Sequence, residues 1–161
     1  MIKKFNFLLI NLFKIGQIKF APGTAASLVT CILFIFLNYY FGFLVIFFLT
    51  ILIFLYSIFA INSSYKNFDS NDPQEIVIDE FVGQMIPLLA IPIYETLFPI
   101  STYYYVLSSF ITFRFFDILK PFPINYVDNN TDGAIGIMLD DIVAGLFSVI
   151  ILIIFFFFVG G

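Results

Sequence analysis

Long apolar runs alternate with short polar clusters along this chain of 161 residues. The run 43–61 contains no charged residue, and about 20 apolar residues are enough for a helix to cross a bilayer. We therefore expect a bundle of about five helices, four or five of which span a membrane. The predicted helices cover residues 24–37, 43–61, 72–89, 102–119 and 142–159, and the first is short enough to insert only partly.

Prolines, glycines and polar residues mark the expected ends of these helices. Thr24 follows Ala21-Pro22-Gly23 and is a good N-cap, and Asp72-Pro73 combines an N-cap with a proline at the first helical position. Residues 1–13 are expected to lie as an amphipathic segment at the membrane surface. The segments between the helices are expected to be turns or loops: 38–42, 62–71, 91–101 and 124–133.

The composition supports the membrane interpretation, because 61% of the residues are hydrophobic and only 11% are charged. An ordinary globular domain has about 25% charged residues, and the mean hydropathy of this chain is +1.07. We expect one all-α, membrane-embedded domain over residues 1–161. Only seven residues are Lys or Arg, so no nucleic-acid surface is expected.

The basic residues predict the orientation of the bundle. The lysines near the N-terminus place that end in the cytoplasm, since positive charge favours the inner side. If the helices then cross in alternation, every basic residue falls on the cytoplasmic side: Lys3, Lys4, Lys14, Lys19, Lys66, Arg114 and Lys120. The polar clusters 72–84, 113–121 and 136–141 reach the same side.

Carboxylates dominate these three clusters. A charge held against hydrocarbon is costly and usually marks a functional site. Asp79 and Glu80 stand at the mouth of a predicted helix, and Asp79 is expected to share a helix face with Glu75. Asp140 and Asp141 open the last predicted helix, so complementing its dipole remains an alternative role for this pair.

Two cations and a carboxylate are spaced three residues apart in the cluster 113–121. Asp117 could form a local ion pair with Arg114 or Lys120, and Lys120 could be a solvated loop charge. Alternatively, both cations bind phosphate. The backbone amides at the start of the Thr24 helix then provide a further anion site, which a ligand can approach closely because Gly23 has no side chain.

Magnesium is the cation that this residue set favours. It is bound through one or two carboxylates together with waters and phosphate oxygens, and needs no histidine, which this chain lacks. Any acid–base work must therefore fall on carboxylates. The combination predicts phosphoryl chemistry on a membrane-embedded substrate.

The residues that several related enzyme classes require are missing from this chain. Cys31 is the only cysteine and has no arginine close behind it, so a cysteine phosphatase and a disulfide framework are both excluded. Asp132-Gly133 begins the Asp-Gly-x-x-Ala-Arg core of CDP-alcohol phosphotransferases but lacks its Ala-Arg. An enzyme like those phosphotransferases, and a small carboxylate-lined ion or proton transporter, remain the alternative functions.

The polar runs together resemble the phosphatidylglycerophosphatase A family, in that family's order. The matching runs are Ala21–Leu28, Asp72–Gln84, Phe113–Pro123 and Gly136–Gly145. The resemblance implies an enzyme of the bacterial inner membrane, and the apolar runs and basic residues predict several spans with the active site facing the cytoplasm. It further implies removal of the terminal phosphate of phosphatidylglycerol phosphate with Mg²⁺, giving phosphatidylglycerol in phospholipid synthesis.

The residues and the resemblance lead to one site hypothesis, in which the substrate is a phospholipid and the cofactor is Mg²⁺. The metal ligands are expected to be Asp79, Glu80, Asp140 and Asp141. The phosphate is expected to contact Gly23, Thr24, Arg114 and Lys120. Asp117 is expected to be a further ligand or the general base, and whether water or a carboxylate attacks first stays open.

Overall fold

The computed structural model describes residues 2–64, 75–98 and 100–160, and all regular structure in these ranges is helical. Asp72, Pro73 and most of the predicted loop 62–71 lie outside the described residues. The elements are α1 (Ile2–Ile10), a 3₁₀ turn η1 (Ile15–Gln17), α2 (Pro22–Ser64), α3 (Ile78–Leu89), α4 (Ile91–Leu97), α5 (Thr102–Leu119), α6 (Ile124–Asn130) and α7 (Gly133–Gly160).

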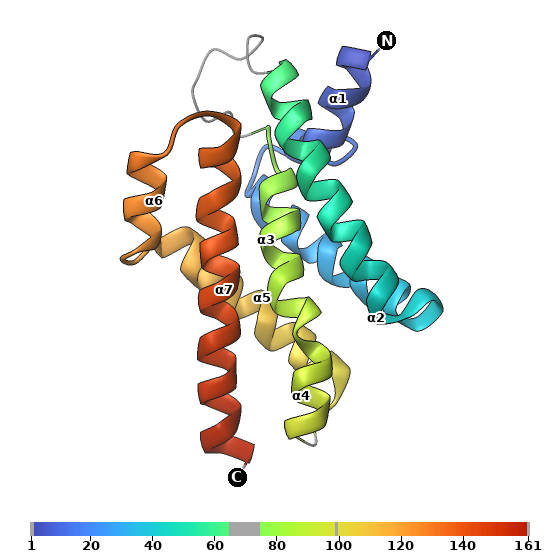
Figure 1. Cartoon of the computed structure of the whole chain (residues 1–161), viewed down its shortest axis with the longest axis vertical. Helices are drawn as coiled ribbons and strands as arrows, with labels where there is room; N and C mark the ends of the chain where they lie inside the picture. The colour runs from blue at the N-terminus through green and yellow to red at the C-terminus, as the bar shows by residue number, and fades with distance from the viewer. Residues whose placement is uncertain (1, 65–74, 99, 161) are drawn as a thin grey trace.

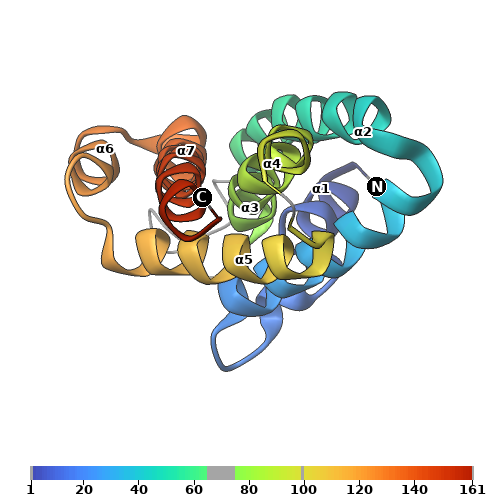
Figure 2. The ribbon, with the colours of Figure 1, turned by 90° about the horizontal axis from the view of Figure 1, so that it is seen from below.

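The helix α2 consists of two arms that meet at Gly42. Gly42 has φ 74° and ψ 172°, a backbone conformation that glycine adopts without the penalty that a Cβ would bring. The chain reverses direction there, as Figures 1 and 2 show at the cyan end of α2. This confirms the predicted turn at 38–42 and the two apolar helices on either side of it.

The helix α3 occupies the middle of the bundle, between α2 and α7, while α5 crosses beside them (Figures 1 and 2). Glycines allow α3 and α7 to pack closely: a Cβ at Gly145 would lie 2.5 Å from the carbonyl oxygen of Gly83. Small residues of this kind let helix backbones approach each other. The contact holds α3 against α7 about one turn beyond Asp79 and Asp141, two of the predicted site residues.

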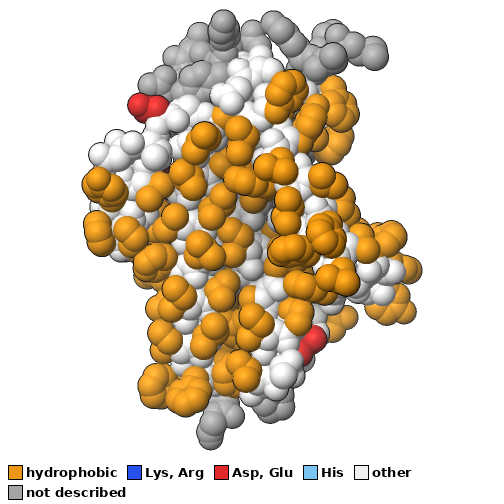
Figure 3. Space-filling view, in the orientation of Figure 1, with side chains coloured by type: hydrophobic (Ala, Val, Ile, Leu, Met, Phe, Trp, Pro, Cys, Tyr) orange, Lys and Arg blue, Asp and Glu red, His pale blue; other side chains and the backbone are white. Residues whose placement is uncertain are grey.

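Apolar side chains cover much of the outer surface. Figure 3 shows them across the middle of one face, with the visible acidic side chains toward its two ends. Phe48, Leu52 and Ile150 are each more than half exposed, an arrangement typical of a lipid-facing surface. Of the described helices, α2 and α7 are long and apolar enough to cross a membrane; the number of spans stays a prediction.

Two segments predicted to be loops contain short helices. Ile91–Leu97 forms α4, with Pro92 in its first turn, where a missing N–H costs nothing. Ile124–Asn130 forms α6, which packs on α7. Polar composition suggested a loop for 124–133, but Asn129 and Asn130 cap their own turn by donating to backbone carbonyls four residues earlier.

The predicted starts of three helices were wrong. α2 begins at Pro22, so Thr24 lies inside the helix and is not its N-cap. α3 begins only at Ile78, because the N–H of Val77 donates to the carbonyl of Ile10 at 2.9 Å instead of continuing a helix. Glu75 is therefore not helical and does not share a helix face with Asp79.

The last helix begins earlier than predicted, at Gly133 instead of Ile142. Asp140 and Asp141 consequently lie in the third turn of α7, too far from its N-terminus to complement the dipole of its first turn. Their burial therefore needs another explanation, which the neighbouring helices supply.

Candidate functional site

One cavity of about 560 Å³ collects every residue that the sequence predicted for the site. Its walls come from the start of α2, the start of α3, the end of α5, the segment from α6 to α7, and the third turn of α7. The predicted residues that line it are Gly23, Thr24, Asp79, Glu80, Arg114, Asp117, Lys120, Asp140 and Asp141.

Three carboxylates that line this cavity lie close together. One oxygen from each of Asp79, Glu80 and Asp141 can be chosen so that all lie within 4.8 Å of one another. Asp79 and Asp141 are buried, and like charges at this separation repel strongly away from water. Asp79 Oδ1 and Glu80 Oε2 are also buried without a hydrogen-bond partner in the described structure. Such a group is stable only with a bound cation or bound protons.

This oxygen-only set fits a hard divalent cation. Buried oxygens without partners are the feature expected of metal ligands in the absence of the ion, and carboxylates suit Mg²⁺ or Ca²⁺. The predicted ligand Asp140 does not join the cluster of Asp79, Glu80 and Asp141. Its Oδ2 instead accepts from Lys120 Nζ at 2.7 Å, while its Oδ1 is buried without a partner.

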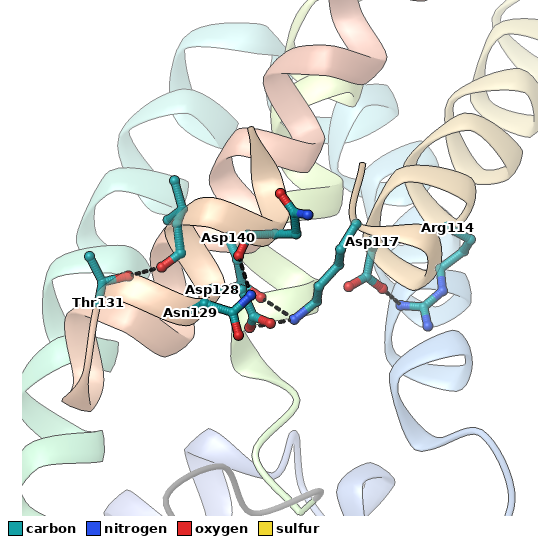
Figure 4. A network of polar contacts seen from close by, with 9 residues as sticks. Arg114, Asp117, Asp128, Asn129, Thr131 and Asp140 are labelled. Atoms are coloured by element: carbon teal, nitrogen blue, oxygen red, sulfur yellow. Dashed lines mark hydrogen bonds and ion pairs between the residues drawn. The ribbon is translucent and has the colours of Figure 1, made fainter. Parts of the chain in front are cut away.

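Lys120 bridges two carboxylates on different helices, those of Asp128 and Asp140, which Figure 4 labels. Its Nζ lies 2.7 Å from Asp128 Oδ1 on α6 and 2.7 Å from Asp140 Oδ2 on α7. Burial by itself lowers the pKa of Lys120, but these two partners outweigh burial and raise that pKa above its usual range. The alternative of a solvated loop charge is therefore wrong, because this ammonium group ties the end of α5 to α6 and α7.

Arg114 forms the local ion pair that the spacing allowed. Its guanidinium lies 2.5 Å from Asp117 Oδ2, one turn further along α5, and Figure 4 shows these two side chains facing each other. Arg114 also donates to Ser27 Oγ on α2 at 3.4 Å, and its Nε is buried without a partner. Arg114 thus links α2 and α5 and retains an unused donor.

Gly23 provides the space for Glu80. A Cβ at position 23 would overlap Glu80 Oε1 and lie 3.3 Å from the Arg114 guanidinium. The carboxylate of Glu80 therefore sits against the start of α2, where the helix dipole favours negative charge. The phosphate contact that was predicted at Gly23 and Thr24 therefore lies next to the carboxylate of Glu80.

Sequence reasoning missed several residues that line the cavity. Asp128 appeared to be a loop residue, although its placement eight residues after Lys120 on a polar turn could have suggested a partner. Lys19 and Asp132 also line the cavity and are exposed. No motif or residue spacing in the sequence marked either of them. Gly83 belongs to the cluster 72–84 and does not line the cavity; its role in the close packing of α3 on α7 depends on Gly145, far along the chain.

A model of the phosphatidylglycerophosphatase A family matches residues 8–156. A phosphatidylglycerophosphatase A of Haemophilus influenzae is 39% identical over 137 residues, which cover 85% of this chain and 80% of the relative. One of Escherichia coli K12 is 38% identical over 95 residues, which cover 59% of this chain and 51% of the relative.

A third relative bears a different name. A Bacteroides thetaiotaomicron protein, described as a candidate phosphatidylinositol-3-phosphatase, is 34% identical over 148 residues, which cover 90% of this chain and 89% of the relative. No solved structure matches the chain. The family match extends over nearly the whole sequence and includes every wall of the cavity. This chain therefore belongs to the phosphatidylglycerophosphatase A family.

Proposed function

We propose that this chain hydrolyses the phosphate monoester of phosphatidylglycerol phosphate, releasing phosphatidylglycerol and inorganic phosphate. The observation that carries the proposal is the buried cluster of Asp79, Glu80 and Asp141 in one cavity with Arg114 and Lys120. That combination suits a phosphoryl group and the cation that accompanies it. The names of two relatives in the same family support the substrate.

The proposed cofactor is Mg²⁺, held by Asp79, Glu80 and Asp141. Asp140 lies outside this cluster, where Lys120 holds its Oδ2 and its Oδ1 stays without a partner in the same cavity. A bound divalent cation supplies charge stabilisation at the phosphoryl oxygens and lowers the pKa of a bound water. Carboxylate-to-amide changes at these positions test the assignment, since an amide keeps the shape and loses the charge.

The chain's own cations bind and orient the phosphate. Arg114 has an unused buried donor and a planar guanidinium suited to two phosphate oxygens. Lys120 supplies a compact charge beside Asp140. Asp117, held by Arg114, lies on the same wall and can accept a proton from water or contribute a ligand oxygen. In the net reaction, water supplies one oxygen to phosphate, and the leaving glycerol oxygen gains a proton.

We further propose that the chain crosses a bacterial inner membrane several times, with the cavity open to the cytoplasm. The apolar outer surface and the helices α2 and α7 support this arrangement. Reporter fusions at Glu95 and Asn130 test it, because Glu95 precedes α5 and Asn130 follows it. The arrangement predicts opposite sides of the membrane for the two fusions, and the same side would contradict it.

The Bacteroides relative raises a second substrate, a phosphatidylinositol 3-phosphate. Both lipids carry a phosphate monoester beyond a phosphodiester, so the same phosphoryl chemistry serves either. Purified protein supplied with equal concentrations of both lipids in neutral detergent decides between them. We expect phosphate release from phosphatidylglycerol phosphate to be the faster reaction, and the reverse order would assign the inositol lipid.

A further inference from the structure

The cations that line the cavity differ in what they contact. Arg114 and Lys120 are both paired with carboxylates. Lys19 also lines the cavity, and within the described part of the chain no carboxylate lies within ion-pair distance of it. It is exposed, so its ammonium group is free to meet a ligand at the cavity's rim.

The side chains next to Lys19 suit a position at the level of lipid headgroups. Ile18 is 46% exposed and Phe20 is 88% exposed, on a short connection between η1 and α2. Exposed apolar and aromatic residues on either side of a lysine are typical of a segment in the membrane interface, where the lysine reaches the headgroup layer. A bilayer phosphodiester lies in that same layer.

The charges along the cavity wall suggest which group of a lipid Lys19 binds. Carboxylates outnumber cations along the cavity wall, so an anionic lipid approaching it meets repulsion at the rim. A dianionic phosphate monoester suits the carboxylate cluster with its divalent cation, whereas a phosphodiester carries one charge and needs only one ammonium group. Both substrates suggested by the relatives' names contain one group of each kind.

We propose that Lys19 binds the phosphodiester of the lipid substrate while the phosphate monoester lies at Asp79, Glu80 and Asp141. The cavity then selects lipids that carry both groups, and Lys19 acts as a specificity residue at the rim. This inference rests on the proposed function for the position of the monoester, whereas the phosphodiester contact at Lys19 can be measured without any reaction.

The test compares Lys19→Ala, Lys19→Arg and Lys14→Ala in neutral detergent micelles. Lys14 is a matched control, because it is an exposed lysine nearby that does not line the cavity. For phosphatidylglycerol phosphate we expect Lys19→Ala to raise KM about tenfold, as loss of one charge-assisted hydrogen bond does, with kcat nearly unchanged. Lys19→Arg should retain the wild-type KM, and so should Lys14→Ala.

Binding of phosphatidylglycerol, which has the phosphodiester but no monoester, is the second arm. We expect Lys19→Ala to weaken it about tenfold and Lys14→Ala to leave it unchanged. Equal losses in both variants would mean general attraction to anionic lipid and would overturn the proposal, as would no loss in Lys19→Ala. If the wild type hydrolyses no lipid, the proposed function fails, and this binding arm still decides the role of Lys19.

Discussion

Gly23 and Glu80 are so close that any side chain at position 23 would overlap the Glu80 carboxylate. Gly23 lies near the start of α2 and Glu80 in the first turn of α3, so two distant segments are fitted to each other at the centre of the site. The missing Cβ at position 23 leaves room for the Glu80 carboxylate in the position where it meets Asp79 and Asp141.

Gly23→Ala is therefore expected to lower the rate of phosphate release by about a hundredfold, the size of effect that small misplacements in an active site produce. Far-UV circular dichroism should remain that of the wild type, because position 23 is helical in any case. The second change Glu80→Asp shortens the clashing side chain and should restore part of the activity to Gly23→Ala. Full activity in Gly23→Ala alone would contradict this fit.

The carboxylate cluster predicts an unusual stability effect. In chelator, Asp79→Asn should raise the unfolding temperature, because it removes one of three mutually repelling groups. Millimolar Mg²⁺ should raise the unfolding temperature of the wild type by binding only the folded state, and that of Asp79→Asn much less. Thermal unfolding in detergent with and without Mg²⁺ measures both effects.

Asp132→Asn is the control for that experiment, since Asp132 lines the cavity but is exposed and outside the cluster. It should respond to Mg²⁺ as the wild type does. If Asp79→Asn is destabilised in chelator and responds to Mg²⁺ like the wild type, the three carboxylates do not form a cation site.

The two partners of Lys120 should contribute unequally to stability. Asp140 is buried and Asp128 is substantially exposed, and exposed ion pairs are worth about 0–1 kcal/mol. Lys120→Met leaves Asp140 buried without its cation and should cost roughly 1–3 kcal/mol of unfolding free energy, less than for a fully buried pair. Asp128→Asn should cost about 0.5 kcal/mol. Denaturant unfolding that ranks Asp128→Asn as the more damaging change would refute this division.

The close contact between Gly83 and Gly145 predicts that a change in the packing of α3 on α7 also lowers activity. A Cβ at position 145 would press on the Gly83 carbonyl and lie 3.0 Å from Ile86 Cβ, so Gly145→Ala must separate α3 from α7. Overpacking of this kind costs about 1–3 kcal/mol. Because Asp79 and Asp141 lie on these two helices, activity should fall as well. Ala144→Gly, at the neighbouring position, should destabilise the helix by about 1 kcal/mol without the same loss of activity.

The sequence alone predicts most of the apolar helices because their composition suffices for burial in lipid. The turn at Gly42 and the helix 102–119 were predicted correctly for this reason. The start of α3 was not, since it depends on Val77 donating to Ile10 and on Gly16 packing against Glu75. Neither contact follows from local propensity, because both join segments far apart along the chain.

For the site as well, the composition of the clusters was predictable and the contacts between them were not. The clustered acids, the basic residues near them and the family resemblance together predicted nine of the residues that line the cavity. The partners within the cavity were not predictable, because Lys120 reaches Asp128 and Asp140 only through the early start of α7 and the short helix α6. Polar residues in 124–133 and glycines at 133 and 136 resemble a loop when their packing against α5 and α7 is unknown.

The most direct measurement is phosphate release from phosphatidylglycerol phosphate by purified wild-type protein and Asp79→Asn, each with Mg²⁺ and with chelator. We expect release only from the wild type with Mg²⁺, and a loss of about a hundredfold or more in the other three conditions. Full activity of the wild type in chelator, or of Asp79→Asn with Mg²⁺, would contradict a metal-assisted phosphatase site at Asp79, Glu80 and Asp141.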